Sequence, residues 1–117
     1  MKRILLLMTI LIPFHGCKYD AVTQSSSLCD VKNPVEELKW LSDLINSKTD
    51  CKIYDGSSLY AFTYNSKTIF YMLNPASSLG ACTELAYDCQ GNKLFSTTDE
   101  WKDFKAKRTD ERFLWKE

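Results

Sequence analysis

Histidine is almost absent from this chain, whose 117 residues include a single one, His15. His15 lies in an N-terminal segment that we expect to be removed on export, so the mature chain is predicted to contain none. This absence excludes Ser-His-Asp and Cys-His nucleophiles, histidine general bases and histidine metal ligands. A pair of carboxylates is the catalytic device that remains.

The chain also lacks an excess of positive charge and a long apolar run. Its 15 Lys and Arg side chains balance 15 Asp and Glu side chains, which leaves no electrostatic footprint for nucleic acid. The apolar run at residues 4–12 is shorter than the about 20 residues that a membrane-spanning helix needs. We therefore expect no nucleic-acid partner, and we interpret the run as part of an export signal.

The N-terminus has the layout of a bacterial signal peptide. Lys2 and Arg3 precede the apolar run, and Gly16 stands directly before Cys17. A cysteine after a small residue resembles a lipobox, so we expect residues 1–16 to be removed and Cys17 to carry diacylglycerol and a fatty acid such as palmitate. The alternative is a secreted chain in which Cys17 is a free thiol.

The expected lipid on Cys17 makes the membrane a partner of the chain and places it in the cell envelope. Residues 17–28 contain Thr23, Gln24 and three serines without apolar periodicity, which is typical of a flexible tether. The predicted location is an outer membrane, with the domain facing the periplasm or the cell surface. Residues 29–117 are then expected to form one globular domain.

Four further cysteines, Cys29, Cys51, Cys82 and Cys89, are an even number in an exported chain, which favours two disulfides. If residues 83–88 form a straight strand, Cys82 and Cys89 lie about 23 Å apart, whereas a bridge requires less than about 7 Å. We therefore predict long-range bridges that join Cys29 and Cys51 to Cys82 and Cys89, in an order left open. No Cys-x-x-Cys pair is present, so we expect no metal site and no cofactor.

Residues 33–46 carry the clearest helix pattern. Asn33 is a suitable N-cap, Pro34 suits the first helical position, and Glu36 stands where a capping box needs it. Apolar side chains then recur at helical spacing, namely Val35, Leu38, Leu41, Leu44 and Ile45. One face of this helix is expected to be buried.

Turn residues after this helix divide the chain into strands. Asp55-Gly56 and Asn65-Ser66 predict hairpins that connect strands at 51–54, 58–64 and 67–73. Further strands are expected at 83–88 and 93–96, with Asp88 opposite Lys93. Thr98 or Asp99 is expected to cap a C-terminal helix that carries Trp101 and Phe104 and is followed by a charged tail with Phe113, Leu114 and Trp115. The predicted fold is α+β, with the N-terminal helix packed on an antiparallel meander of four to five strands and a short C-terminal helix.

The predicted register separates the side chains of the meander into two faces. One face carries Cys51, Ile53, Tyr60, Phe62, Tyr64, Ile69, Tyr71 and Leu73, and we expect it to meet the N-terminal helix. The other face includes Tyr54, Phe70 and Met72 and is expected to be partly uncovered. Together with Trp101 these three are the candidate partner-binding residues, although aromatic stripes on strands more often belong to a core.

Several segments together resemble a known family. Cys17 after a short signal, Cys29 before N-P-V-E-E-L-K-W-L, the strands around A-F-T-Y-N-S-K-T-I-F-Y, and Y-D-C-Q-G-N are similar to a family of small uncharacterised Bacteroidota lipoproteins. The similarity covers about residues 29–94. That resemblance implies lipidation at Cys17 and no other functional residue.

The combination of a tether with few catalytic residue types favours a binding function. We expect a non-enzymatic, lipid-anchored module that binds an envelope protein or glycan through a sheet face, a sheet edge or residues 74–81. One alternative is a hydrolase or lyase that acts on envelope glycans through a carboxylate pair including Glu84 or Asp88. Another is a structural envelope lipoprotein. The sequence leaves the oligomeric state open.

Overall fold

The structure, a computed structural model, describes residues 27–117, so the expected signal peptide and Cys17 lie outside the described residues. Its order of elements is α1 (Pro34–Glu37), α2 (Lys39–Ile45), β1 (Ser58–Tyr64), β2 (Lys67–Leu73), the 3-10 helix η1 (Gly80–Cys82), β3 (Glu84–Tyr87), α3 (Thr98–Lys107) and β4 (Thr109–Lys116). Between residues 27 and 117, no helix has the length and apolar character that a membrane span requires. The α+β class is as predicted.

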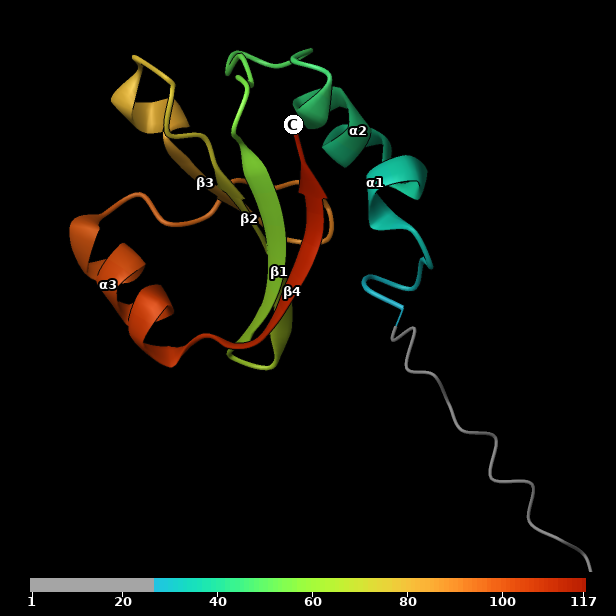
Figure 1. The fold of residues 1–117 in the computed structure, drawn as a ribbon. Coiled ribbons are helices and arrows are strands. Elements are labelled where there is room, and N and C mark those ends of the chain that lie inside the picture. The colour runs from blue at the N-terminus through green and yellow to red at the C-terminus, as the bar shows by residue number, and fades with distance from the viewer. Residues whose placement is uncertain (1–26) are drawn as a thin grey trace, which may run out of the picture.

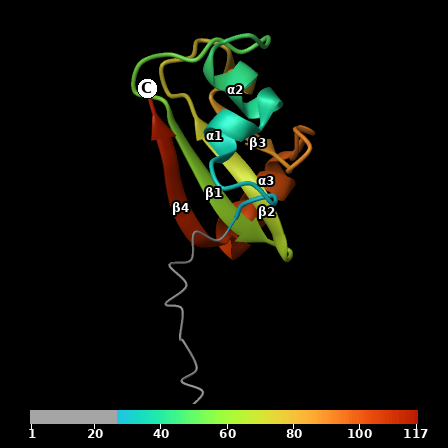
Figure 2. The same ribbon diagram turned by 90° about the vertical axis from the view of Figure 1, so that its right-hand side faces the viewer.

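Four antiparallel strands form one sheet in the order β3-β2-β1-β4 (Figures 1 and 2). The β1–β2 hairpin has the predicted two-residue turn, because Tyr64 pairs with Lys67. Asn65 and Ser66 in that turn have φ angles of 48° and 61°, as a turn that matches the twist of the strands requires. The predicted hairpin with strands at 58–64 and 67–73 is confirmed. The strand predicted near 83–88 is also present, as β3.

The prediction of a helical C-terminal tail is wrong, because residues 109–116 form β4 and pair with β1. Arg108, with φ −62° and ψ 142°, ends α3 in an extended conformation. Leu114 and Trp115 then pack against the core on the side of α2. The tail therefore completes the sheet as an edge strand instead of extending the helix.

Two expected strands, at 51–54 and 93–96, do not form. Residues 51–54 run as coil, and residues 93–96 contribute only an isolated bridge between Tyr87 and Lys93. The expected pairing of Asp88 with Lys93 is also wrong. The Asp88 carboxylate instead accepts hydrogen bonds from the backbone N–H groups of Gln90 and Asn92, at 2.9 Å each, and so holds the turn around Gly91.

Helices cover both faces of the sheet, with α3 on one side and α1 and α2 on the other (Figure 1). For β1 and β2 the predicted assignment of faces is reversed, whereas Cys51 and Ile53 pack on the side of α2 as predicted. Leu41 and Leu44 of α2 pack with Leu59, Phe70 and Met72. The face with Phe62, Ile69 and Tyr71 is instead covered by Phe104 of α3. The core therefore has two parts, separated by the sheet.

The N-terminal helical segment is broken at Leu38, whose ψ of 105° interrupts the helix between α1 and α2. The expected capping box with Glu36 is not formed, and the backbone N–H of Asn33 instead donates to the Glu37 carboxylate at 2.6 Å. A complete capping box begins α3, where Thr97 and Glu100 form the two reciprocal hydrogen bonds. The start of α3 is thus one residue earlier than the sequence indicates.

Two disulfides join the segments around α1 and α2 to the segments around β3. One links Cys29 to Cys89 and the other links Cys51 to Cys82, with sequence separations of 60 and 31. Both are long-range, as predicted, and the structure supplies the order that the sequence left open. Two disulfides are consistent with an extracytoplasmic domain, because such bonds persist in oxidising compartments.

Candidate functional site

A cleft with a volume of about 650 Å³ opens beside the N-terminal end of α3. It is lined by η1 with Thr83 and Glu84, by residues 93–96, and by Glu100 and Trp101. Small-molecule sites in proteins commonly have volumes of about 300–1,000 Å³. The cleft therefore has the size of a ligand site, and three short segments within residues 80–101 build it.

The η1 wall of the cleft is fixed by the Cys51–Cys82 disulfide and by Asn74, which is fully buried. The Asn74 side-chain amide donates to the carbonyl oxygens of Lys52 and Cys82, at 2.9 and 3.2 Å. These bonds hold both ends of residues 74–82 against the sheet. The loop before η1 is thus anchored although it has no regular structure over 74–79.

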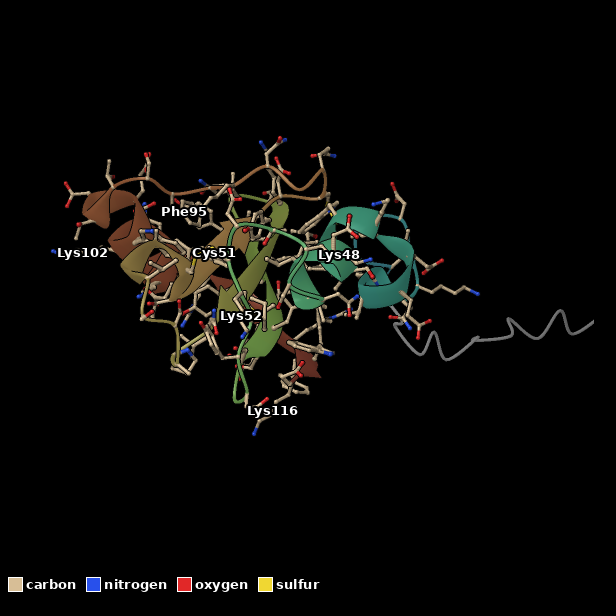
Figure 3. All side chains as sticks on the ribbon, turned by 90° about the horizontal axis from the view of Figure 1, so that it is seen from above. Lys48, Cys51, Lys52, Phe95, Lys102 and Lys116 are labelled. Carbon is tan, nitrogen blue, oxygen red and sulfur yellow. A yellow bond between two sulfur atoms is a disulfide. The ribbon has the colours of Figure 1, made fainter. Side chains whose placement is uncertain are left out.

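Phe95 forms the middle wall and has a φ of 60°, in the left-handed region that an aromatic residue rarely adopts. Its ring stacks on Phe104 with a centroid distance of 4.9 Å and meets Trp101 edge-on at 5.2 Å. Figure 3 labels Phe95 in the segment that leads into α3. These ring contacts hold the unfavourable backbone conformation, and strain of this kind is often found at functional sites.

Glu84 is held by two donors on one of its oxygens. Its Oε1 accepts a hydrogen bond from the Tyr71 hydroxyl at 2.7 Å and an ion pair from Lys105 at 2.7 Å. Partial burial raises the pKa of the Glu84 carboxyl, but the bonds from Lys105 and Tyr71 outweigh burial and lower that pKa below its ordinary value. Glu84 is therefore ionised at neutral pH.

Glu100 is the second carboxylate of the cleft, and it is also held through one oxygen. Its Oε2 accepts from the backbone N–H groups of Thr97 and Ser96, at 3.0 and 2.6 Å. These two bonds lower the pKa of the Glu100 carboxyl. The same contacts cap α3, so the charge and the helix start are fixed together.

Arg108 lies below this part of the site, among aromatic rings. Its guanidinium is 4.4 Å from the ring centroid of Phe62, 5.4 Å from that of Tyr71 and 5.5 Å from that of Phe104. Its Nη1 is buried without a hydrogen-bond partner in the described part of the chain. Burial and the hydrogen bond to Glu84 raise the pKa of Tyr71, so its hydroxyl remains a donor to Glu84.

Of the candidate partner-binding residues, the structure brings only Trp101 into the cleft. Phe70 and Met72 are fully buried under α2, so their prediction as partner-binding residues is wrong. The reason is that α1 and α2 cover the face that we expected to be open. Tyr54 is half-buried and lies outside the cleft lining, with the Lys52 ammonium 5.2 Å from its ring centroid.

The carboxylates named for a hydrolase, Glu84 and Asp88, do not form a pair. Glu84 begins β3 and Asp88 directly follows its last residue, Tyr87, which separates their Cα atoms by about 13 Å at 3.3 Å per residue. Within residues 27–117, no group of three or more His, Cys, Asp or Glu side chains is arranged to hold a metal ion. The residues that the sequence did not single out are Phe95, Glu100 and Arg108, since nothing in their spacing distinguishes them.

Comparisons with known proteins add no family to this description. No protein-family model, no curated protein and no solved structure matches the chain. The resemblance to small Bacteroidota lipoproteins therefore stays a prediction.

Proposed function

We propose that this chain is a binding module in the cell envelope, anchored by a lipid on Cys17, that holds an envelope protein or glycan in the cleft beside α3. The two disulfides support a location outside the cytoplasm. The anchor rests on the sequence pattern around Cys17, which lies outside the described residues. The tether at residues 17–28 would give the domain reach from the membrane surface.

The observation that carries this proposal is the rigid, mixed lining of the cleft. The rings of Phe95 and Trp101 supply apolar contact, while Glu84 and Glu100 supply fixed hydrogen-bond acceptors. Ligand sites typically combine apolar walls with a few polar groups that are held in place. Side chains that are already ordered lose little conformational entropy when a ligand binds.

Hydrolysis through a carboxylate pair receives less support from the same residues. A glycoside hydrolase needs one carboxyl group with a raised pKa that can donate a proton. The pKa values of Glu84 and Glu100 are both lowered by their hydrogen bonds, so neither group holds a proton at neutral pH. Two ionised carboxylates suit the recognition of hydroxyl or amide donors better than acid catalysis.

Photo-cross-linking in intact cells tests the site. A diazirine amino acid at Lys93, which is exposed and lines the cleft, is expected to form adducts with the partner. The matched control is the same amino acid at Lys102, an exposed residue of α3 that points away from the body of the molecule (Figure 3). Equal adduct patterns from the two positions, or none from Lys93, would contradict the proposal.

The anchor has its own test. Cells grown with an alkyne-bearing fatty acid are expected to label the wild-type chain, and Cys17→Ser is expected to abolish the label because the lipid-bearing thiol is lost. Equal labelling of the Cys17→Ser variant would locate the lipid elsewhere. A wild-type chain without label would support the secreted alternative.

A further inference from the structure

The cleft has two acceptor oxygens that the protein holds in place but does not use. The hydrogen bonds that described residues make to the Glu84 side chain end on Oε1, and those made to the Glu100 side chain end on Oε2. The second oxygen of each carboxylate is therefore available as a fixed acceptor. Because an ionised carboxylate donates no hydrogen bond, these oxygens select ligands with donor groups such as hydroxyls.

An aromatic wall stands beside these acceptors. Trp101 of α3 contacts the rings of Phe95 and Tyr71 at centroid distances of 5.2 and 6.2 Å. A ring that is packed on neighbouring rings offers apolar surface at low entropy cost. Apolar surface and acceptors together match a ligand with C–H faces and peripheral hydroxyls.

The charges around the cleft balance. The cleft region carries two carboxylates and two ammonium groups, since Lys93 lines the cleft with Glu84 and Glu100, and Lys105 is 2.7 Å from Glu84 and 5.8 Å from the Trp101 ring centroid. An anionic ligand would approach two carboxylates, and a cationic ligand would approach two ammonium groups. A purely apolar ligand would remove water from all four charged groups and form no hydrogen bonds with them in exchange. An uncharged ligand that is rich in hydroxyl groups avoids each of these penalties.

We infer that the cleft binds an uncharged sugar ring of a glycan, with Trp101 against one face of the ring and with Glu84 and Glu100 accepting its hydroxyls. The inference rests on the proposed function and specifies the chemistry of its ligand. Lys93, at the mouth of the cleft, donates to a ring or hydroxyl oxygen. At the η1 wall the lining residues Gly80 and Ala81 present little side chain, which leaves space for the ring.

The test is a titration of the full chain, with its disulfides intact, by neutral trisaccharides. The probes are maltotriose, cellotriose, xylotriose, mannotriose and N-acetylchitotriose, and the charged counterparts are glucosamine trimer and trigalacturonate. We expect at least one neutral probe to shift the Trp101 indole resonance saturably, with a Kd of about 1 mM or lower. The charged trimers are expected to bind at least about tenfold more weakly, which corresponds to 1.4 kcal/mol.

Two exposed alanines provide a matched pair of variants. Ala81→Trp fills the cleft from its η1 wall, whereas Ala106→Trp adds the same side chain on α3 outside the cleft lining. We expect Ala81→Trp to weaken the binding of the neutral probe at least about tenfold and Ala106→Trp to leave it unchanged. Both positions are exposed, so neither substitution removes a core contact.

The outcomes separate this inference from the proposed function. Charged trimers that bind as tightly as neutral ones, or binding that survives Ala81→Trp, would overturn the sugar inference. If no neutral probe binds while Lys93 cross-links to a protein, the sugar inference fails and the binding function stands with a peptide ligand. If no probe binds and Lys93 gives no adduct above Lys102, both fail.

Discussion

Replacing Asn74 with alanine is the most direct test of how the cleft is held. Asn74 is fully buried, and its side chain makes four hydrogen bonds. Its Oδ1 accepts from the Ser57 hydroxyl at 2.7 Å and from the Tyr54 N–H at 3.3 Å. Its Nδ2 donates to the carbonyl oxygens of Lys52 and Cys82, at 2.9 and 3.2 Å. The substitution removes these bonds and leaves their four partner groups without the hydrogen bond that Asn74 supplied.

The expected loss follows from those partners. Each net hydrogen bond contributes about 1 kcal/mol, and a buried group left without a partner costs about 1–3 kcal/mol. Ser57 is fully buried and cannot turn to water, whereas the backbone groups of Lys52 and Tyr54 lie nearer the surface. We therefore expect Asn74→Ala to lower the free energy of unfolding by about 3–4 kcal/mol, which is a large share of the about 5–15 kcal/mol of a typical domain.

Asn74→Asp separates hydrogen bonding from side-chain volume. The aspartate keeps the acceptor but turns a second oxygen toward the carbonyls of Lys52 and Cys82, where Nδ2 had donated. Burial and these carbonyls would raise the folded-state pKa of the introduced carboxyl above its unfolded value. The protonated form is then favoured in the folded state, so the deficit of this variant should shrink as the pH falls.

Urea unfolding of the oxidised protein, followed by tryptophan fluorescence, measures these changes. The control is Asn46→Ala, since Asn46 is exposed and donates only to Ser42 at the end of α2. That variant is expected to lose less than about 1 kcal/mol. A loss below about 1 kcal/mol for Asn74→Ala, or a deficit of Asn74→Asp that grows on acidification, would refute the reasoning.

Three further predictions concern the stability of the fold. A Cβ on Gly91 would lie 2.6 Å from Cγ of Trp40, whereas Gly56, at a similar positive φ, has open space, so Gly91→Ala should lose about 1–3 kcal/mol more than Gly56→Ala in urea unfolding. Reducing the disulfides, with separations of 31 and 60, should cost about 4 kcal/mol for each, and an unchanged urea midpoint would contradict this. The lowered pKa of Glu84 stabilises the fold above its unfolded pKa, so Glu84→Gln should flatten the loss of stability on acidification.

The β1–β2 hairpin could be predicted because its information is local. Asn65 and Ser66 favour a tight turn with positive φ, and the strand residues on either side fix the register. The assignment of faces could not be predicted in the same way. Both faces of β1 and β2 are apolar, since Phe62 and Phe70 lie on opposite faces and are both buried. Which face meets α2 and which meets α3 is therefore set by the long-range packing of the helices, and the pattern within the strands does not determine it.

β4 was missed because an edge strand with many charged residues has no clear alternation. Shifts of register between β1 and β4 break the period of two, so that Leu114 and the adjacent Trp115 both pack on the side of α2. Phe113 stays exposed on the other face, beside Tyr60. Charged side chains and irregular pairing are common devices that keep an open edge from adding further strands.

Of the cleft lining, the sequence singled out Trp101, Glu84 and part of residues 74–81, whereas Phe95 and Glu100 could not be predicted because the cleft depends on how three short segments within residues 80–101 pack together. Phe95 carries no local signal for a positive φ, and its conformation is explained by the rings of Phe104 and Trp101. Glu100 was hidden among many acidic residues, and its role depends on where α3 begins. Sequence periodicity reports burial within an element and says little about where two loops meet a helix.

The walls of the cleft connect the proposed ligand binding to the oxidising location. η1 is held by the Cys51–Cys82 bond and Asn74, while residues 93–96 are held by the Leu94 N–H bond to Ala86 at 2.8 Å. A disulfide holds η1, whereas a hydrogen bond holds residues 93–96, so reduction should loosen η1 before it disturbs the sheet. A ligand that needs both walls would then be released while the β1–β2 hairpin is still formed. Binding in the cleft is therefore expected to require the oxidised chain, whose two disulfides are consistent with an extracytoplasmic location.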